Sequence, residues 1–237
     1  MRAGTRKYRR GRPDCLIPAQ KNSVPLIFDG LEYHKYKARQ ARRRREIVLI
    51  SEDRFLHYAL CRHLPSNRHV VIFPNLDALV GGVNYRDFSL LIIDLKGLTQ
   101  PLIDVLQIIR RLSCQFPTLR IALLVARLPS ALHNLIAAST ACTLVNRRLP
   151  VPWLGHELRA VIAKPPDLAG KITVNQWRIL EEMCSGKSLA ALAEEMNKPY
   201  HHASYQLTRM MKILGISTRA QWLRLLHQIT LPASADS

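Results

Sequence analysis

The sequence predicts two folded domains: an α/β domain with a doubly wound, five-stranded parallel sheet, followed by an all-α domain of four helices. Apolar runs alternate with amphipathic helical segments through residues 46–163, which is the pattern of strands and crossover helices. A segment with two prolines and a glycine follows at residues 164–171, and only helical periodicity remains in residues 172–230. The chain of 237 residues is long enough for two domains that each bury a core.

The first domain begins at Glu46 with a continuous apolar run, which is typical of a strand buried on both faces. We predict strands over residues 47–50, 70–73, 89–93, 120–125 and 142–145. Each is followed by a predicted helix, over residues 55–64, 77–80, 102–112, 130–138 and 154–162. Sheets of this kind bind ligands outside the carboxyl ends of their strands, so candidate site residues are those that follow strands.

The second domain begins with a capping box, Thr173-x-x-Gln176, which opens its first helix. Gly186 is expected to end that helix in the left-handed conformation, and Ser188 to cap the next one. The polar turn 197–199 contains a proline and separates that helix from one that restarts at about Tyr200. A fourth helix, over residues 218–229, is expected to place four apolar side chains on one side: Trp222, Leu223, Leu226 and Ile229.

The two helices that flank this turn, within residues 188–215, carry an inward apolar stripe and a polar, basic outward stripe. This is the pattern of a helix-turn-helix, which lays its second helix in the major groove of DNA. The formal charge of +18 and the pI of about 10.3 also point to a polyanionic partner, either nucleic acid or an anionic membrane surface.

The positive charge is unevenly distributed along the chain. Residues 1–45 hold 14 Lys or Arg against three acidic residues, a net charge of +11, which leaves +7 for residues 46–237. This composition predicts a disordered extension, and the alternative is an arm that binds phosphates without reading sequence. Residues 231–237 are expected to form a short tail.

Neither a membrane span nor a metal or disulfide framework is predicted. No apolar run is long enough to cross a bilayer, and no apolar segment follows the N-terminal arginines as in a secretory signal. The five scattered cysteines lack a CxxC pair and suit a reducing cytoplasm. Nothing in the sequence suggests a cofactor or the nucleophile-and-base set of an enzyme.

The C-terminal domain resembles the LuxR/FixJ type of helix-turn-helix found in bacterial transcription regulators. The resemblance runs without gaps from Ile172 to Arg219, and its last part is most similar to the RcsB-type capsule regulators. The matching residues are Ile172, Thr173, Gln176, Ile179, Leu180, Gly186, Ser188, Leu192, Ala193, Met196, Gln206, Leu214, Gly215 and Arg219. A related alternative is the homologous fold of a sigma-factor subunit, which the preceding α/β domain disfavours.

The resemblance implies which side chains contact DNA. Ser188, His202 and Gln206 fall where the family contacts phosphates, and the groove-facing positions are His201, Ser204, Tyr205 and Arg209, with Lys187, Lys198 and Lys212 completing the set. The recognition helix departs from the family pattern, with Pro199 in place of a serine and His202-Ala203-Ser204 in place of Thr-Val-Lys. Serine and histidine make less selective base contacts than lysine or arginine, so we expect a factor that needs a partner for specificity.

The N-terminal domain resembles the receiver of a response regulator. Glu52 and Asp53 follow the first strand, where receivers bind Mg²⁺, and Asp94 ends the third strand at the phosphoacceptor position. The family's hydroxyl and lysine, which read the phosphoryl charge, are replaced by Val125 and Asn146. Arg147 is adjacent, but a shift of one residue at a strand end is expected to point its side chain elsewhere.

These departures favour a degenerate receiver that serves as a dimerisation module. The alternatives are a conventional response regulator phosphorylated on Asp94, a small-ligand site in the same domain, and an adaptor with little DNA binding of its own. Because one helix-turn-helix reads a half-site, we expect a homodimer or a heterodimer with an RcsB-like regulator. The resemblance implies pairing through the last helix, with Trp222, Leu223 and Leu226. The alternative is that some of these three residues cap the domain core. Double-stranded DNA is the predicted ligand, and RNA polymerase is a further candidate partner.

Overall fold

The computed structural model describes residues 46–64, 69–80, 85–164 and 172–232. The predicted basic extension over residues 1–45 and nearly all of the predicted linker therefore lie outside the described residues. Every predicted strand and helix of both domains is present, with boundaries shifted by up to three residues.

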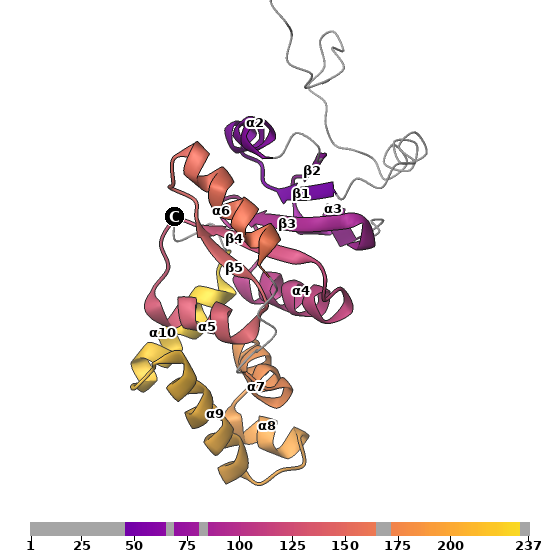
Figure 1. Ribbon diagram of the computed structural model, residues 1–237. Helices are drawn as coiled ribbons and strands as arrows, with labels where there is room; N and C mark the ends of the chain where they lie inside the picture. The colour runs from indigo at the N-terminus through magenta and orange to yellow at the C-terminus, as the bar shows by residue number, and fades with distance from the viewer. Residues whose placement is uncertain (1–45, 65–68, 81–84, 165–171, 233–237) are drawn as a thin grey trace, which may run out of the picture.

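Five parallel strands form one sheet in the order β2-β1-β3-β4-β5, which confirms the predicted fold class (Figure 1). The strands are β1 (Glu46–Ile50), β2 (Val70–Phe73), β3 (Phe88–Asp94), β4 (Arg120–Val125) and β5 (Thr143–Asn146). All seven residues of β3 are buried, because this central strand has neighbours on both sides and helices over both faces.

Successive side chains of each strand point to opposite faces, so the apolar runs supply two separate layers. One layer, built on Ile47 and Leu49, packs against α2 (Arg54–His63) and α6 (Val151–Ala163). The other, built on Val48 and Ile50, packs against α3 (Leu76–Val80), α4 (Leu102–Gln115) and α5 (Ser130–Ser139).

Four helices make up the C-terminal domain: α7 (Val174–Cys184), α8 (Leu189–Glu195), α9 (Tyr200–Leu214) and α10 (Arg219–Thr230). The capping box of Thr173 and Gln176 is present, and a second one, formed by Thr218 and Gln221, opens α10. Gly186 adopts φ +88° and Gly215 adopts φ +70°, left-handed conformations that side chains other than glycine disfavour.

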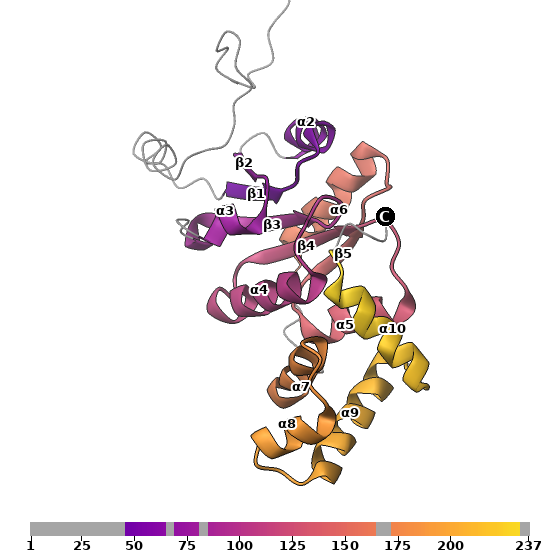
Figure 2. The same cartoon turned by 180° about the vertical axis from the view of Figure 1, so that it is seen from behind.

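The helical domain lies against the α4 and α5 side of the sheet, as Figures 1 and 2 both show. Most of its buried residues, among them Trp177, Leu214 and Trp222, belong to the same hydrophobic cluster as the α4 and α5 side chains. The two domains therefore share one apolar core. The last described residues, Leu231 and Pro232, also contact the sheet domain: Leu231 accepts a hydrogen bond from the backbone N–H of Leu102 at 3.3 Å, and Pro232 forms a β-bridge with Pro101.

Two polar side chains of the sheet domain join it to the helical domain. The Arg110 guanidinium stacks on the Trp177 ring, 4.5 Å from its centroid, and donates to the Ser139 carbonyl at 2.5 Å. Asn134 of α5 donates from its side-chain amide to the Leu214 carbonyl at 3.1 Å, which satisfies one of the free carbonyls at the end of α9.

No helix among the described residues is both long enough and apolar enough to span a membrane.

We predict that Arg110→Ala lowers the free energy of unfolding by about 1–3 kcal/mol, because it removes both a cation–π contact and a hydrogen bond between helices. Arg111→Ala is the matched control, since Arg111 is the exposed neighbour on the same helix and should change stability by less than about 0.5 kcal/mol. Urea unfolding followed by tryptophan fluorescence measures both. If the two variants unfolded at the same urea concentration, the prediction that Arg110 stabilises the shared core would be contradicted.

Candidate functional site

The helix-turn-helix is formed by α8, a tight turn and α9. Ser188 caps α8 by accepting a hydrogen bond from the Ala191 N–H at 3.2 Å. The turn is closed by a bond of 2.9 Å from the Lys198 N–H to the Ala193 carbonyl, while Asn197 adopts φ 49°. Pro199 occupies the N-cap of α9, where its missing N–H costs nothing.

The residues predicted to contact DNA gather on α9 and the segments beside α8, at the end of the molecule farthest from the sheet (Figures 1 and 2). Seven are exposed and three are half-buried. The exposed ones are Lys187, Ser188, Lys198, His201, Tyr205, Arg209 and Lys212; the half-buried ones are His202, Ser204 and Gln206. Tyr200, which the sequence analysis did not single out, is also exposed at the start of α9.

Gln206 is held from behind by the capping box of α7. Gln176 is 1% exposed; its side-chain oxygen accepts from the Thr173 N–H at 3.0 Å and its amide donates to the Gln206 side-chain oxygen at 3.2 Å. Because the acceptor of Gln206 is occupied, its two N–H donors remain for an acceptor such as a phosphate oxygen. The capping box therefore orients α9 as well as opening α7.

Lys187 is the predicted contact whose charge is already compensated within the chain. Its ammonium lies 2.8 Å from the Glu182 carboxylate and 2.9 Å from that of Glu195, which also pairs with Arg178. The hydrogen bond from Lys187 is the largest cause that holds the pKa of Glu195 below its usual value. Lys187 must leave these partners to neutralise a DNA phosphate.

Of the three residues predicted to pair, Trp222 and Leu226 contribute to the core, which is the alternative that the sequence left open, and Leu223 lies at the surface. Trp222 is 3% exposed and lies in the shared core, because α10 packs against α4 and α7. Leu226 is half-buried against the same cluster, whereas Leu223 is 52% exposed. The buried stripe of α10 continues through Leu225 and Ile229, so Leu223 is the member of the predicted set left at the surface.

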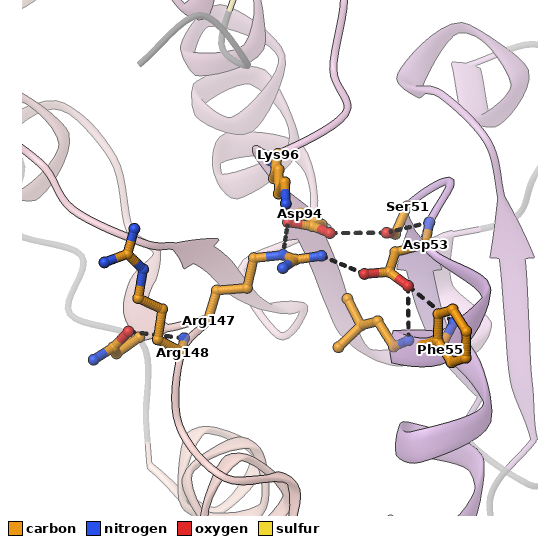
Figure 3. A network of polar contacts seen from close by, with 9 residues as sticks. Ser51, Asp53, Phe55, Asp94, Lys96, Arg147 and Arg148 are labelled. Atoms are coloured by element: carbon orange, nitrogen blue, oxygen red, sulfur yellow. Dashed lines mark hydrogen bonds and ion pairs between the residues drawn. The ribbon is translucent and has the colours of Figure 1, made fainter. Parts of the chain in front are cut away.

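The second candidate site lies at the carboxyl edge of the sheet, around Asp94 (Figure 3). Asp94 ends β3 and is 2% exposed. One carboxylate oxygen accepts from the Ser51 hydroxyl at 2.8 Å, and the other from the Lys96 backbone N–H at 3.2 Å and from Arg147 Nε at 2.9 Å. Both oxygens of the phosphoacceptor-like residue are thus engaged.

Arg147 points into this site, so the prediction that its side chain points elsewhere is wrong. Besides Asp94, its guanidinium bonds to the Asp53 carboxylate at 2.5 Å. Side-chain alternation ends with β5 at Asn146, whose side-chain oxygen accepts from the Arg148 N–H at 2.9 Å and turns the chain. From this turn the long arginine side chain reaches back across the edge of the sheet, as Figure 3 shows.

The predicted acidic pair is not assembled. Glu52 is exposed and is not part of the network, while Asp53 caps α2 by accepting from the N–H groups of Phe55 at 2.9 Å and Leu56 at 3.1 Å. Sequence reasoning missed Ser51, which directly precedes Glu52, and it missed the hydrogen bond from the Lys96 backbone to Asp94. No group of three or more metal-binding side chains occurs in the described part of the chain.

Opposite charges stabilise one another in this network. Burial by itself raises the pKa of Asp53, but the Leu56 N–H and the Arg147 guanidinium outweigh it, and the pKa lies below its usual value. Burial lowers the pKa of Arg147, but the hydrogen bonds and negative charges of Asp94 and Asp53 together outweigh it, so its pKa is raised. The site therefore holds a permanent cation between two carboxylates.

Comparison with known proteins gives one similar curated protein. The chain is 27% identical over 224 residues to the Fimbriae Y protein of Salmonella typhimurium strain LT2, and the match covers 94% of this chain and 92% of that protein. No family model matches the chain.

Solved structures with a similar fold include two regulators. RcsB of Salmonella enterica serovar Typhimurium, bound to the promoter rprA in the presence of phosphomimetic BeF3⁻, is 19% identical with a TM-score of 0.44, covering 77% of this chain and 98% of that one. Full-length FixJ of B. japonicum is 16% identical with a TM-score of 0.38, covering 78% of this chain and 96% of that one.

We predict that Arg147→Ala lowers the free energy of unfolding by about 3 kcal/mol at pH 7, because it leaves the buried Asp94 carboxylate without its cation. Urea unfolding of four proteins measures this: wild type, Arg147→Ala, Asp94→Asn and the double variant. Asp94→Asn should destabilise the wild type but stabilise the Arg147→Ala variant, since it removes the unpaired charge. The same sign of effect in both backgrounds would contradict the pairing.

Proposed function

We propose that this chain is a DNA-binding transcriptional regulator whose receiver-like domain works without phosphorylation, and that it is a binding protein rather than an enzyme. The main support for DNA binding is the exposed face of α9, which carries His201, Tyr205 and Arg209 beyond a buried apolar stripe. The N-terminal end of a recognition helix usually contacts base edges, and that end of α9 points away from the sheet domain (Figure 1).

The shared core supports a fixed presentation of α9 to DNA. The contacts to the sheet domain involve the last residue of α9, where Asn134 bonds to the Leu214 carbonyl, and they leave the exposed side chains uncovered. Binding to DNA then requires no separation of the domains. Such a protein acts where the chromosome is, so we place it in the cytoplasm.

Independence from phosphorylation is supported by the network around Asp94. Transfer of a phosphoryl group needs a free carboxylate oxygen and a metal ion to neutralise the developing charge. Here both oxygens accept hydrogen bonds, and Arg147 lies between Asp94 and Asp53 where Mg²⁺ would need oxygen ligands. The positive charge that a phosphorylated receiver obtains from Mg²⁺ and a lysine is supplied by the chain itself.

Pairing with a second regulator is the remaining part of the proposal. One helix-turn-helix reads a half-site, and paired half-sites require a dimer. The partner is a second copy of this chain or an RcsB-like regulator, with the exposed Leu223 face of α10 as the contact. RNA polymerase is a further partner once the protein is on a promoter.

We predict that acetyl phosphate and Mg²⁺ add no phosphate to the wild-type chain, because neither the free carboxylate oxygen nor the metal site is available. Intact-mass measurement checks this, with a phosphorylatable response regulator as the positive control. A phosphate located on Asp94 would instead establish the conventional response regulator. Mg²⁺ alone should also leave the thermal midpoint of the wild type unchanged. In Arg147→Ala the carboxylates of Asp53 and Asp94 are released from the arginine, so the thermal midpoint of this variant should rise with the Mg²⁺ concentration.

We predict that Arg209→Ala weakens binding to a selected DNA site by roughly tenfold or more, the size expected for one lost base contact. Sites are first selected from genomic fragments. Promoters of fimbrial genes are tested individually, since the similar Fimbriae Y protein has a name that refers to fimbriae. Arg111→Ala, which removes an equal charge from an exposed site on α4, should bind like the wild type.

DNA binding measured over a series of salt concentrations distinguishes a sequence-specific regulator from an adaptor with little DNA binding of its own. If the wild type shows the steep salt dependence of phosphate contacts but no preference among sequences, alone or with an RcsB-like partner, the sequence-specific proposal fails.

A further inference from the structure

A small pocket lies at the carboxyl edge of the sheet, beside the Asp94 network and against the C-terminal helix. Residues that follow β3, β4 and β5 form its polar side, and α10 and the segment after it close it with Gln228 and Pro232. The remaining lining is largely apolar: Leu95, Leu102, Leu124, Val125, Ala126, Leu128 and Leu132. The pocket is therefore built by both domains.

The charged residues that line this pocket are all cations: Lys96, Arg127 and Arg147. In the described part of the chain, the Lys96 ammonium and the Arg127 guanidinium have no ion-pair partner. Arg147 uses Nε and one terminal nitrogen for Asp94 and Asp53, and its other terminal nitrogen keeps its N–H donors. Two unpaired cations and a partly used third thus border one space that contains no acidic side chain.

The size of the pocket limits what it can hold. Its volume is about 40 Å³, and one water molecule needs roughly 10–15 Å³ on this scale. The space therefore suits a group of a few heavy atoms. Apolar walls with a few polar groups are typical of small-molecule sites, and the side chains of Lys96 and Arg127 border this one from the solvent-exposed side.

We propose that this pocket binds a small oxyanion, either inorganic phosphate or the phosphate group of a small ester, without forming a bond to Asp94. Lys96 and Arg127 supply the charge, Arg147 offers its remaining N–H donors, and the Gln228 amide offers donors from α10. Binding of the anion breaks no existing contact, because Asp53 and Asp94 keep their hydrogen bonds to Arg147.

A bound oxyanion joins the two domains, since it contacts residues after three strands and one residue of the last helix. It should therefore stabilise the attachment of α10 to the sheet domain. The proposed anion binding depends only on the residues that line the pocket. Any effect of the anion on DNA binding depends on the function proposed above.

The test is the thermal midpoint of the full chain in rising concentrations of inorganic phosphate, compared with potassium chloride at equal ionic strength. Lys96→Gln and Arg127→Gln remove pocket cations. Arg148→Gln is the matched control, because it removes an equal charge from an exposed residue at the same edge that does not line the pocket. We expect a saturable rise of the midpoint for the wild type and Arg148→Gln. Lys96→Gln and Arg127→Gln should lose it or need at least roughly tenfold more phosphate.

Equal responses of all four proteins would overturn the proposal, because they would indicate nonspecific ion binding, for example to the basic residues 1–45. Glycerol phosphate, tested in the same way, distinguishes the two candidate ligands. If it half-saturates the site at a lower concentration than inorganic phosphate does, the ligand is a phosphate ester. If it needs a higher concentration, the ligand is inorganic phosphate. DNA binding of the same variants is measured without phosphate. The proposed anion binding and the proposed DNA-binding function can therefore be rejected independently of each other.

Discussion

Asp94 carries a carboxylate that is 2% exposed, and burying such a charge without compensation would cost several kcal/mol. The strand placed it there because the residues before it are apolar and buried on both faces. Compensation comes from Ser51, the Lys96 N–H and above all Arg147, each from a different chain segment at the same edge of the sheet. The need to compensate the charge of Asp94 explains the geometry of this edge of the sheet. It also explains the turn at Asn146, which lets Arg147 reach Asp53 and Asp94.

The helical domain is tied to the sheet domain by a second requirement. Trp177, Leu214 and Trp222 are buried in a hydrophobic cluster to which both domains contribute. They are covered by α4 and α5, with Arg110 and Asn134 satisfying polar groups at the boundary. The orientation of α9 is therefore set by packing against the sheet domain as well as by the turn that precedes it.

The parts that sequence predicted well are those determined by neighbouring residues. The strands follow from continuous apolar runs, and the caps at Thr173 and Ser188 from oxygen atoms that reach an N–H three residues away. The errors concern contacts between distant segments. The direction of the Arg147 side chain was predicted from strand alternation, which no longer applies where the chain turns. For Trp222 the sequence left both a pairing surface and the domain core open, because the packing of α10 on α4 cannot be read from α10. The exposed set on α9 was predicted because its periodicity is local, whereas the link from Gln206 to Gln176 was not.

An arginine side chain stays protonated throughout the physiological pH range, and the contacts of Arg147 raise its pKa further. The charge between Asp53 and Asp94 can therefore be neither titrated away nor removed by a phosphatase. The positive charge at this edge of the sheet is encoded by the codon for Arg147, so it is present in every folded copy of the chain.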